Sequence, residues 1–220
     1  LGAVVAVRVT AVLAILLASP ALFFDFLVDD WLHRLVLLGE AGELGFSHAR
    51  DGLFAFVDGG PPQVAALRNS GFLPWWTLDS LHLSFWRPIA VWTHQLDYAL
   101  WPDSPLLMHA HSLVWLGVCT VLAGVLYRRV MGAAWPAGLA LLFFAVEDAH
   151  AMPAGWVANR NGLVALAFGL AAILAHVRWR ETRRPVFGVV ACLCLVASLL
   201  SKEAGIAVAA YVFAYVVFVE

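Results

Sequence analysis

Residues 1–24 form an almost wholly apolar run, interrupted chiefly by Arg8 and Pro20. About 20 consecutive apolar residues suffice to cross the hydrocarbon core of a bilayer. We therefore predict a first membrane-spanning helix over residues 1–24. The stretch LLASPA near its end could instead close a signal peptide, since small residues precede the cleavage point of such peptides. The length of the run and the lack of a visible basic segment before it favour the spanning helix.

Five further apolar runs follow and define the expected fold class. Of the 220 residues, 63% are hydrophobic and 13% are charged, a balance unlike that of a soluble domain. We predict an all-α fold, a polytopic transmembrane helical bundle of about six spans that forms a single domain over residues 1–220. Because the sequence starts without methionine and stops after an apolar run, we expect a piece of a longer chain. The later runs, within 106–220, are 106–127, 133–146, 162–177, 186–200 and 204–219.

Arginines gather in two of the connecting segments and set the expected orientation. Arginine-rich connections stay on the cytoplasmic side of a membrane. Residues 25–105, 147–161 and 201–203 then lie on the extracytoplasmic side, which also receives the clustered acidic residues. We expect an integral, multi-pass protein of a cell inner membrane or an ER-type membrane, with an extracytoplasmic active face. The arginines are Arg128 and Arg129 after the second run, and Arg178, Arg180, Arg183 and Arg184 after the fourth.

The long connection 25–105 is expected to fold back on the membrane as an extracytoplasmic loop with amphipathic, interfacial helices. Trp31, Leu35 and Leu38 recur at helical spacing, which predicts one such helix. Pro88 suits the first turn of another, because the N–H that proline lacks is not needed there. Six of the ten tryptophans fall in this connection, and tryptophan favours the headgroup level.

The sequence argues against nucleic-acid binding and several soluble-enzyme chemistries. No basic run suited to nucleic acid is present. No nucleophile elbow, phosphate-cradling glycine loop or zinc-type spacing of cysteine and histidine occurs. The three cysteines, Cys119, Cys192 and Cys194, lie inside apolar runs, so we expect no disulfide framework.

Four motifs follow one another along the chain: FWRPIAVWTHQLDYALW (85–101), HAHS (109–112), HAMPAGWVANRNGLVA (150–165) and SLLSKEAGIAV (198–208). With an acidic pair after the first helix, this order resembles the N-terminal half of the GT-C membrane glycosyltransferases. More narrowly, it resembles the branch related to protein O-mannosyltransferases and to membrane proteins with a tetratricopeptide tail. The resemblance covers nearly the whole chain and implies a GT-C-like bundle.

One position departs from the family pattern. Asn161 stands where the family more often carries an acid. Any role for a carboxylate at that position is therefore in doubt. Glu147 and Asp148, at the start of the same turn, could supply one instead.

The resemblance implies transfer of a sugar from a polyprenyl-phosphate-linked donor to an acceptor hydroxyl on a protein, glycan or lipid. Such a transfer needs a carboxylate to take the hydroxyl proton and a cation to stabilise the departing phosphate. Asp29 and Asp30 are the candidate catalytic bases, because repulsion between adjacent carboxylates brings one pKa closer to the working pH. The alternative is an ordinary helix start, since acids favour the positive end of a helix dipole.

Four basic residues are candidates for the donor phosphate. Arginine offers a bidentate fork and lysine a point charge. Each has an alternative role. Arg160 and Lys202, at helix ends, could simply extend to the lipid headgroups. Arg87 could anchor the loop, and His109 could be an ordinary interfacial residue. The phosphate-binding candidates are Arg160, Lys202, His109 and Arg87, and the supporting candidates are Glu203, His150, Glu147 and Asp148.

A divalent cation is a further candidate ligand. His33 follows Asp30 and Asp29 by three and four residues on one helical face, and carboxylates with an imidazole suit such an ion. Two or three ligands without a further partner make a weak signal, so no cofactor is assigned. His94 and Asp97 are also three residues apart, and we expect them to hydrogen-bond and fix packing.

Two other functions compete with the enzyme. A non-catalytic polytopic protein, such as a transporter or an assembly subunit, would place ionisable residues near the midplane of the membrane. The ionisable residues here are expected at one surface, which favours the enzyme. An inactive GT-C relative would explain the altered turn around Asn161.

Overall fold

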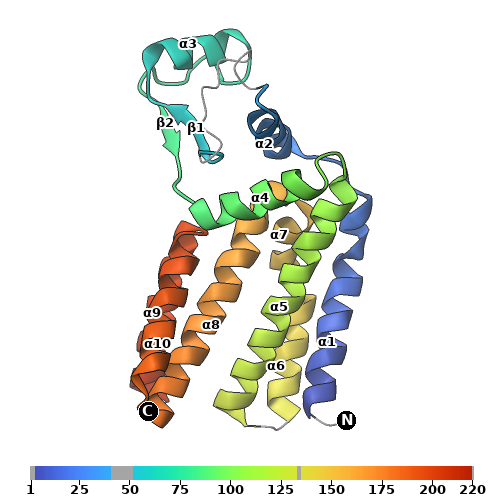
Figure 1. The fold of residues 1–220 in the computed structure, drawn as a ribbon, viewed down its shortest axis with the longest axis vertical. Coiled ribbons are helices and arrows are strands. Elements are labelled where there is room, and N and C mark those ends of the chain that lie inside the picture. Colours follow the sequence, from blue (N-terminus) through green and yellow to red (C-terminus); the bar gives the residue numbers. More distant parts are fainter. Residues whose placement is uncertain (1–2, 41–51, 133–134, 220) are drawn as a thin grey trace.

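The computed structural model describes residues 3–40, 52–132 and 135–219, which are helical apart from one small sheet and the connecting loops. This confirms the all-α fold class. Helices α1, α5, α6, α8, α9 and α10 run side by side as a bundle (Figure 1). The first residues of α1 and the last residues of α10 lie at the same end of it.

The bundle has two chemically different ends. The end that carries the predicted arginine connections is called the arginine end, and the opposite end is called the loop end. The bundle helices are α1 (Ala3–Ala18) with the 3-10 helix η1 (Ser19–Phe23), α5 (Pro105–Met131), α6 (Trp135–Val146) with η3 (Asp148–His150) and α7 (Ala151–Gly155), η4 (Val157–Arg160) with α8 (Asn161–Thr182), α9 (Pro185–Leu199), and η5 (Glu203–Ile206) with α10 (Ala207–Phe218).

Within the described residues, three helices are long and apolar enough to cross a membrane: Val4–Phe23, Pro105–Met131 and Val157–Thr182. There are up to four if α6 and the helix after it, which bend by 46°, form one span. The helices α9 and α10 are shorter. At about 1.5 Å per residue, the 15 residues of α9 fall short of a hydrocarbon core of about 30 Å. The structure therefore supports three or four of the six predicted spans by length.

Small residues let the bundle helices approach closely. A Cβ atom on Gly124 of α5 would lie 3.0 Å from the Val7 side chain of α1. At the corner between α9 and η5, a Cβ atom on Gly205 would lie 2.7 Å from the backbone carbonyl carbon of Ser198. Real Cβ atoms do not come so near to backbone atoms, so glycine is required at this corner. The tight corner fixes Lys202, which lies within it.

The described part of the predicted loop 25–105 contains three helices and a small sheet. Helix α4 lies across the loop end of the bundle, and the other elements stand beyond it (Figure 1). The two strands are antiparallel, with a register irregularity between Ala55 and Val57. Gly39 ends the first of the helices in the left-handed conformation, at φ 85°. The elements are α2 (Val28–Leu38), β1 (Ala55–Asp58), α3 (Pro61–Asn69), β2 (His82–Ser84) and α4 (Pro88–Leu100).

The loop region has a hydrophobic cluster of its own. It joins Leu32 and Val36 of α2 with Val64 of α3 and Val91 of α4. The buried residues of α2, which include Leu32, His33 and Val36, centre on the side of the helix roughly opposite Trp31, which is 50% exposed. The loop region therefore packs on the side of α2 opposite the apolar face predicted to meet the membrane interface, where Trp31 and Leu38 stay exposed.

Candidate functional site at the loop end

The 3-10 helix η4 is the point where the loop region, α4 and the α9–η5 corner meet. Three consecutive residues of η4 each bind a different part of the chain. The Ala158 N–H donates to Asp30 Oδ1 at 2.5 Å, and the Asn159 Oδ1 accepts from Lys202 Nζ at 2.9 Å. Arg160 binds residues of α4 and α5. The structure therefore brings together three of the predicted site residues, Asp30, Arg160 and Lys202.

Asp30 is enclosed and both of its carboxylate oxygens accept backbone hydrogen bonds. Besides Ala158, the Leu27 N–H donates to Oδ2 at 3.0 Å, which caps the start of α2. The side chain is 2% exposed, and loss of hydration raises the pKa of Asp30 to about 6 even though backbone N–H groups oppose the change. Asp30 thus links α2 to η4, and both of its carboxylate oxygens are already occupied by backbone N–H groups.

Asp29 differs from its neighbour in its environment. Its side chain is half-buried, and burial raises the pKa of Asp29 above the usual value. No hydrogen bond or ion pair engages this carboxylate within the described residues. Of the two predicted bases, Asp29 is therefore the one whose oxygens remain available to a substrate hydroxyl.

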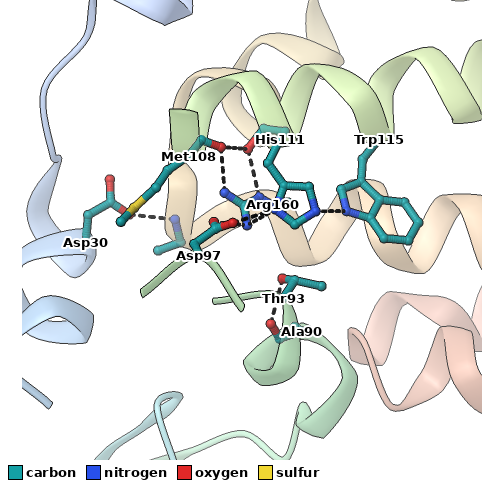
Figure 2. Close-up of polar contacts among 10 residues, drawn as sticks. Asp30, Ala90, Thr93, Asp97, Met108, His111, Trp115 and Arg160 are labelled. Carbon is teal, nitrogen blue, oxygen red and sulfur yellow. Dashed lines mark hydrogen bonds and ion pairs between the residues drawn. The ribbon is translucent and has the colours of Figure 1, made fainter. Parts of the chain in front are cut away.

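Arg160 lies at the centre of a buried network (Figure 2). Its Nη1 donates to Asp97 Oδ2 at 2.5 Å, and its Nε and Nη2 donate to the Ser112 hydroxyl and the Met108 carbonyl at 2.9 and 2.7 Å. The Arg160 and Asp97 side chains are both 0% exposed. A phosphate could reach this guanidinium only if the network opened. In the observed arrangement Arg160 holds η4 against α4 and α5.

His111 completes the network. Its Nδ1 lies 2.6 Å from Asp97 Oδ1, and the Trp115 indole N–H donates to its Nε2 at 3.1 Å. Since the indole only donates, Nε2 must accept, which places the proton of a neutral imidazole on Nδ1. Sequence spacing had predicted that Asp97 pairs with His94. The structure instead pairs it with two residues of the bundle, because Asp97 faces the bundle and His94 faces the loop region.

The α9–η5 corner carries a second charged pair. The Arg87 Nε lies 3.1 Å from both carboxylate oxygens of Glu203, and its Nη2 lies 2.6 Å from one of them. The guanidinium also lies 5.0 and 4.5 Å from the ring centres of Phe54 and Phe85. Arg87 therefore anchors the loop region to the corner. Beside this pair, burial and then the Arg87 charge lower the pKa of Lys202.

An apolar cleft of about 540 Å³ runs along α8, with walls from α5, α6, α9, η5 and α10. Leu166 and Ile173 of α8 and Tyr211 of α10 are among its lining residues. Lys202 and Gly162 also line it, and a Cβ atom on Gly162 would lie 3.7 Å from the Lys202 ammonium. The cleft thus has an apolar body and a single cation among its lining residues, located at the loop end.

The remaining predicted site residues lie around this centre. His109 is fully buried, with its ring edge-on to Phe24 at 6.4 Å. The His150 Nε2 lies 2.8 Å from the backbone carbonyl oxygen of Phe144. Phe144 is one of the residues that line the cleft. Glu147 and Asp148 are exposed at the bend after α6.

The predicted metal ligands do not converge. His33 packs against Phe54 and His94, at ring-centre distances of 4.9 and 5.2 Å, whereas the Asp30 carboxylate points to η4. Among the described residues, no group of three or more histidine, cysteine, aspartate or glutamate side chains is arranged to hold a metal ion. The grouping of Asp29, Asp30 and His33 suggested by their spacing is therefore not formed.

Acidification is expected to weaken the joint between α4 and the loop region through His94. This side chain is 1% exposed, and burial, with the Arg160, His33 and His111 charges, lowers the pKa of His94 well below its usual value. Below about pH 6.5 the unfolded chain binds a proton at His94 that the folded state does not bind. The free energy of unfolding therefore falls by up to about 1.4 kcal/mol for each unit by which the pH is lowered. Thermal unfolding between pH 7.5 and 5 measures this loss.

Two variants separate His94 from other groups. His94→Gln should flatten the acid loss, whereas the exposed His82→Gln should leave it unchanged. Asp30 acts in the opposite sense, because its raised pKa makes the folded state bind a proton more tightly between about pH 6 and 4. Asp30→Asn should therefore steepen the loss. An identical acid slope in wild type and His94→Gln would contradict the assignment.

The fold and the site together define an α-helical protein with helices able to cross a membrane and with its buried polar network at one end of the bundle. A scan of protein-family models, a search of curated proteins and a search of solved structures each found no match to this chain.

Proposed function

We propose that this chain is the membrane core of a GT-C-type glycosyltransferase that moves a sugar from a polyprenyl-phosphate donor to an acceptor hydroxyl. The observation that carries the proposal is the apolar cleft along α8 with the Lys202 ammonium at its loop end. A long isoprenoid chain needs an apolar groove, and its phosphate needs a cation at the groove's mouth. The contact of Lys202 with η4, the same short helix that Asp30 binds, links this mouth to the acidic pair.

The proposal includes six spans and an orientation. The short helices α9 and α10 would cross the bilayer with little tilt and borrow flanking residues. The arginine end would face the cytoplasm, because basic connections are retained there. The loop end, with Lys202 and Asp29, would then lie at the extracytoplasmic headgroup level of an inner or ER-type membrane.

Each site residue then has a defined part in the transfer. The acceptor oxygen bonds to the anomeric carbon while its proton moves to Asp29 and the donor phosphate leaves with the electrons of the broken bond. Lys202 stabilises the negative charge on the departing phosphate. Asp30, Arg160 and Asp97 position η4 through their hydrogen bonds and do not touch the substrate.

The donor site is tested by binding of farnesyl phosphate, a short isoprenoid phosphate, to the detergent-solubilised protein. Lys202→Gln removes a charge-assisted contact that contributes about 1.5–3 kcal/mol, so affinity should fall about 10- to 100-fold. The matched control is Arg68→Gln, because Arg68 forms an exposed ion pair with Asp79 in the loop region. Affinity for farnesol, which has no phosphate, should be low and indifferent to Lys202→Gln.

Transfer itself is measured in liposomes with labelled polyprenyl-phosphate sugars. Loss of both binding and transfer in Lys202→Gln would support the enzyme. Binding by the wild type without release or transfer of sugar from any donor would favour the inactive relative. Equal farnesyl phosphate affinity in Lys202→Gln and wild type would contradict the assignment of Lys202 to the donor phosphate.

A further inference from the structure

The arginine end of the bundle holds a concentration of positive charge that the proposed transfer does not use. Its six arginines come from the last turn of α5, the last turns of α8 and the connection to α9. Among the described residues of these segments, Glu181 is the only carboxylate. The arginines are Arg128, Arg129, Arg178, Arg180, Arg183 and Arg184.

Glu181 organises part of this surface. Its carboxylate accepts from both Nε and Nη2 of Arg129, with the Nε at 2.9 Å, and lies 3.6 Å from Nη1 of Arg178. The Arg178 guanidinium also lies 5.8 Å from the ring centre of Phe187, at the start of α9. The ends of α5, α8 and α9 are therefore held together, and one negative charge is shared between two positive ones.

Arg128, Arg183 and Arg184 form no ion pair with a carboxylate within the described residues. The Nε atom of Arg128 is enclosed without a hydrogen-bond partner there. Arg183 and Arg184 are exposed, and Arg183 adopts a left-handed backbone conformation, at φ 55°. The enclosed Nε of Arg128 is out of reach of an outside anion, whereas the exposed guanidiniums of Arg183 and Arg184 are open to one. The surplus of positive charge and these two exposed guanidiniums point to an anion bound where α8 ends and α9 begins.

We propose that this anion is the headgroup of a phospholipid with a net negative charge. The exposed apolar side chains Val130 and Met131 of α5 and Val186 and Val189 of α9 adjoin the arginines along their helices. Acyl chains can lie against these side chains while the phosphate meets the guanidiniums. A free anion would gain only the second contact. The site thus combines charge and apolar contact in the way that favours anionic lipids at a membrane surface.

The test is lipid capture by the full chain in nanodiscs of phosphatidylcholine with and without phosphatidylglycerol, read by native mass spectrometry. Wild type should retain phosphatidylglycerol in preference to phosphatidylcholine. The double variant Arg183→Gln/Arg184→Gln should reduce this preference about 30-fold, the equivalent of about 1 kcal/mol per guanidinium. Arg68→Gln, in the loop region, should keep the preference.

Three outcomes would overturn the lipid site: no phosphatidylglycerol preference in wild type, an unchanged preference in the double variant, or displacement of the lipid by inorganic phosphate at matched ionic strength. The last result would show that a free anion suffices. Lys202→Gln should leave phosphatidylglycerol capture unchanged, so failure of the donor site and failure of the lipid site can be told apart.

Discussion

Asp97→Ala is expected to destabilise the protein by about 3–5 kcal/mol, the largest effect of any single substitution at the loop end. Arg160 and Asp97 are both 0% exposed, and their atoms approach to 2.5 Å. Removing the carboxylate leaves a guanidinium buried without its counter-charge, which is far more costly than losing the pair as a whole. His111 also loses the partner of its Nδ1. Thermal unfolding in detergent measures the change.

Two comparisons make this result specific. Asp79→Ala breaks the exposed ion pair with Arg68 and should cost less than about 1 kcal/mol. Combining Asp97→Leu with Arg160→Met replaces the buried pair by apolar groups and should recover much of the loss. A stability for Asp97→Ala equal to that of Asp79→Ala would show that Arg160 does not depend on this carboxylate.

Asp29→Asn is expected to reduce sugar transfer by about 10²–10⁴-fold without reducing farnesyl phosphate affinity. The amide has nearly the same shape but cannot accept the acceptor's proton. Because burial raises the pKa of Asp29, its carboxylate forms only as the pH rises through that raised value, so transfer should increase with pH and then level off. The measurement is transfer in liposomes at several pH values, with thermal unfolding recorded in parallel.

The neighbouring carboxylates provide the controls. Asp30→Asn should lower stability, because Asp30 accepts hydrogen bonds from Ala158 and Leu27. Asp25→Asn, at an exposed residue whose oxygen caps the Phe26 N–H, should retain transfer. Transfer at the wild-type rate in Asp29→Asn would show that Asp29 is not the base, even if binding at the donor site were confirmed.

The helices of the bundle could be predicted because each appears in the sequence as a continuous apolar run, although within the described residues only three or four of the six predicted spans are long enough to cross a membrane. The run 162–177 marks α8, but the helix continues to Thr182 through the arginines of its last turns. The apolar run stops at the first charged residue, whereas the backbone hydrogen bonds of the helix continue past it. The run 186–200 nearly coincides with α9, so the shortness of that helix was visible in the sequence.

The loop region was harder to predict. Strands β1 and β2 have only four and three residues, too few to establish an alternating pattern. The burial of α2 depends on Val64 and Val91, which lie far along the chain. Local periodicity therefore indicated the helix and one apolar face, but not the opposite side on which the loop region packs.

The sequence named candidate site residues but could not show how the chain uses each of them in its contacts. The family resemblance and positions at predicted helix ends selected Asp30, Arg160 and Lys202, which the structure joins through η4. They could not show that both Asp30 oxygens are occupied, because their donors are backbone groups. The Asp97–His111 contact was missed, since it joins two helices whose relative rotation no local pattern records. The spacing of four residues from His111 to Trp115 was the available signal.

The bond between Asp30 and Ala158 also has a consequence for biosynthesis. Its partners are 128 residues apart, so a ribosome that adds about 5–20 residues per second needs roughly 6–25 s to deliver the second after the first. During this interval the Asp30 carboxylate lacks its hydrogen-bond donor, the Ala158 N–H, and the segment around it is exposed to chaperones and proteases. Docking of η4 against Asp30 would thus be a late step in the folding of the nascent chain.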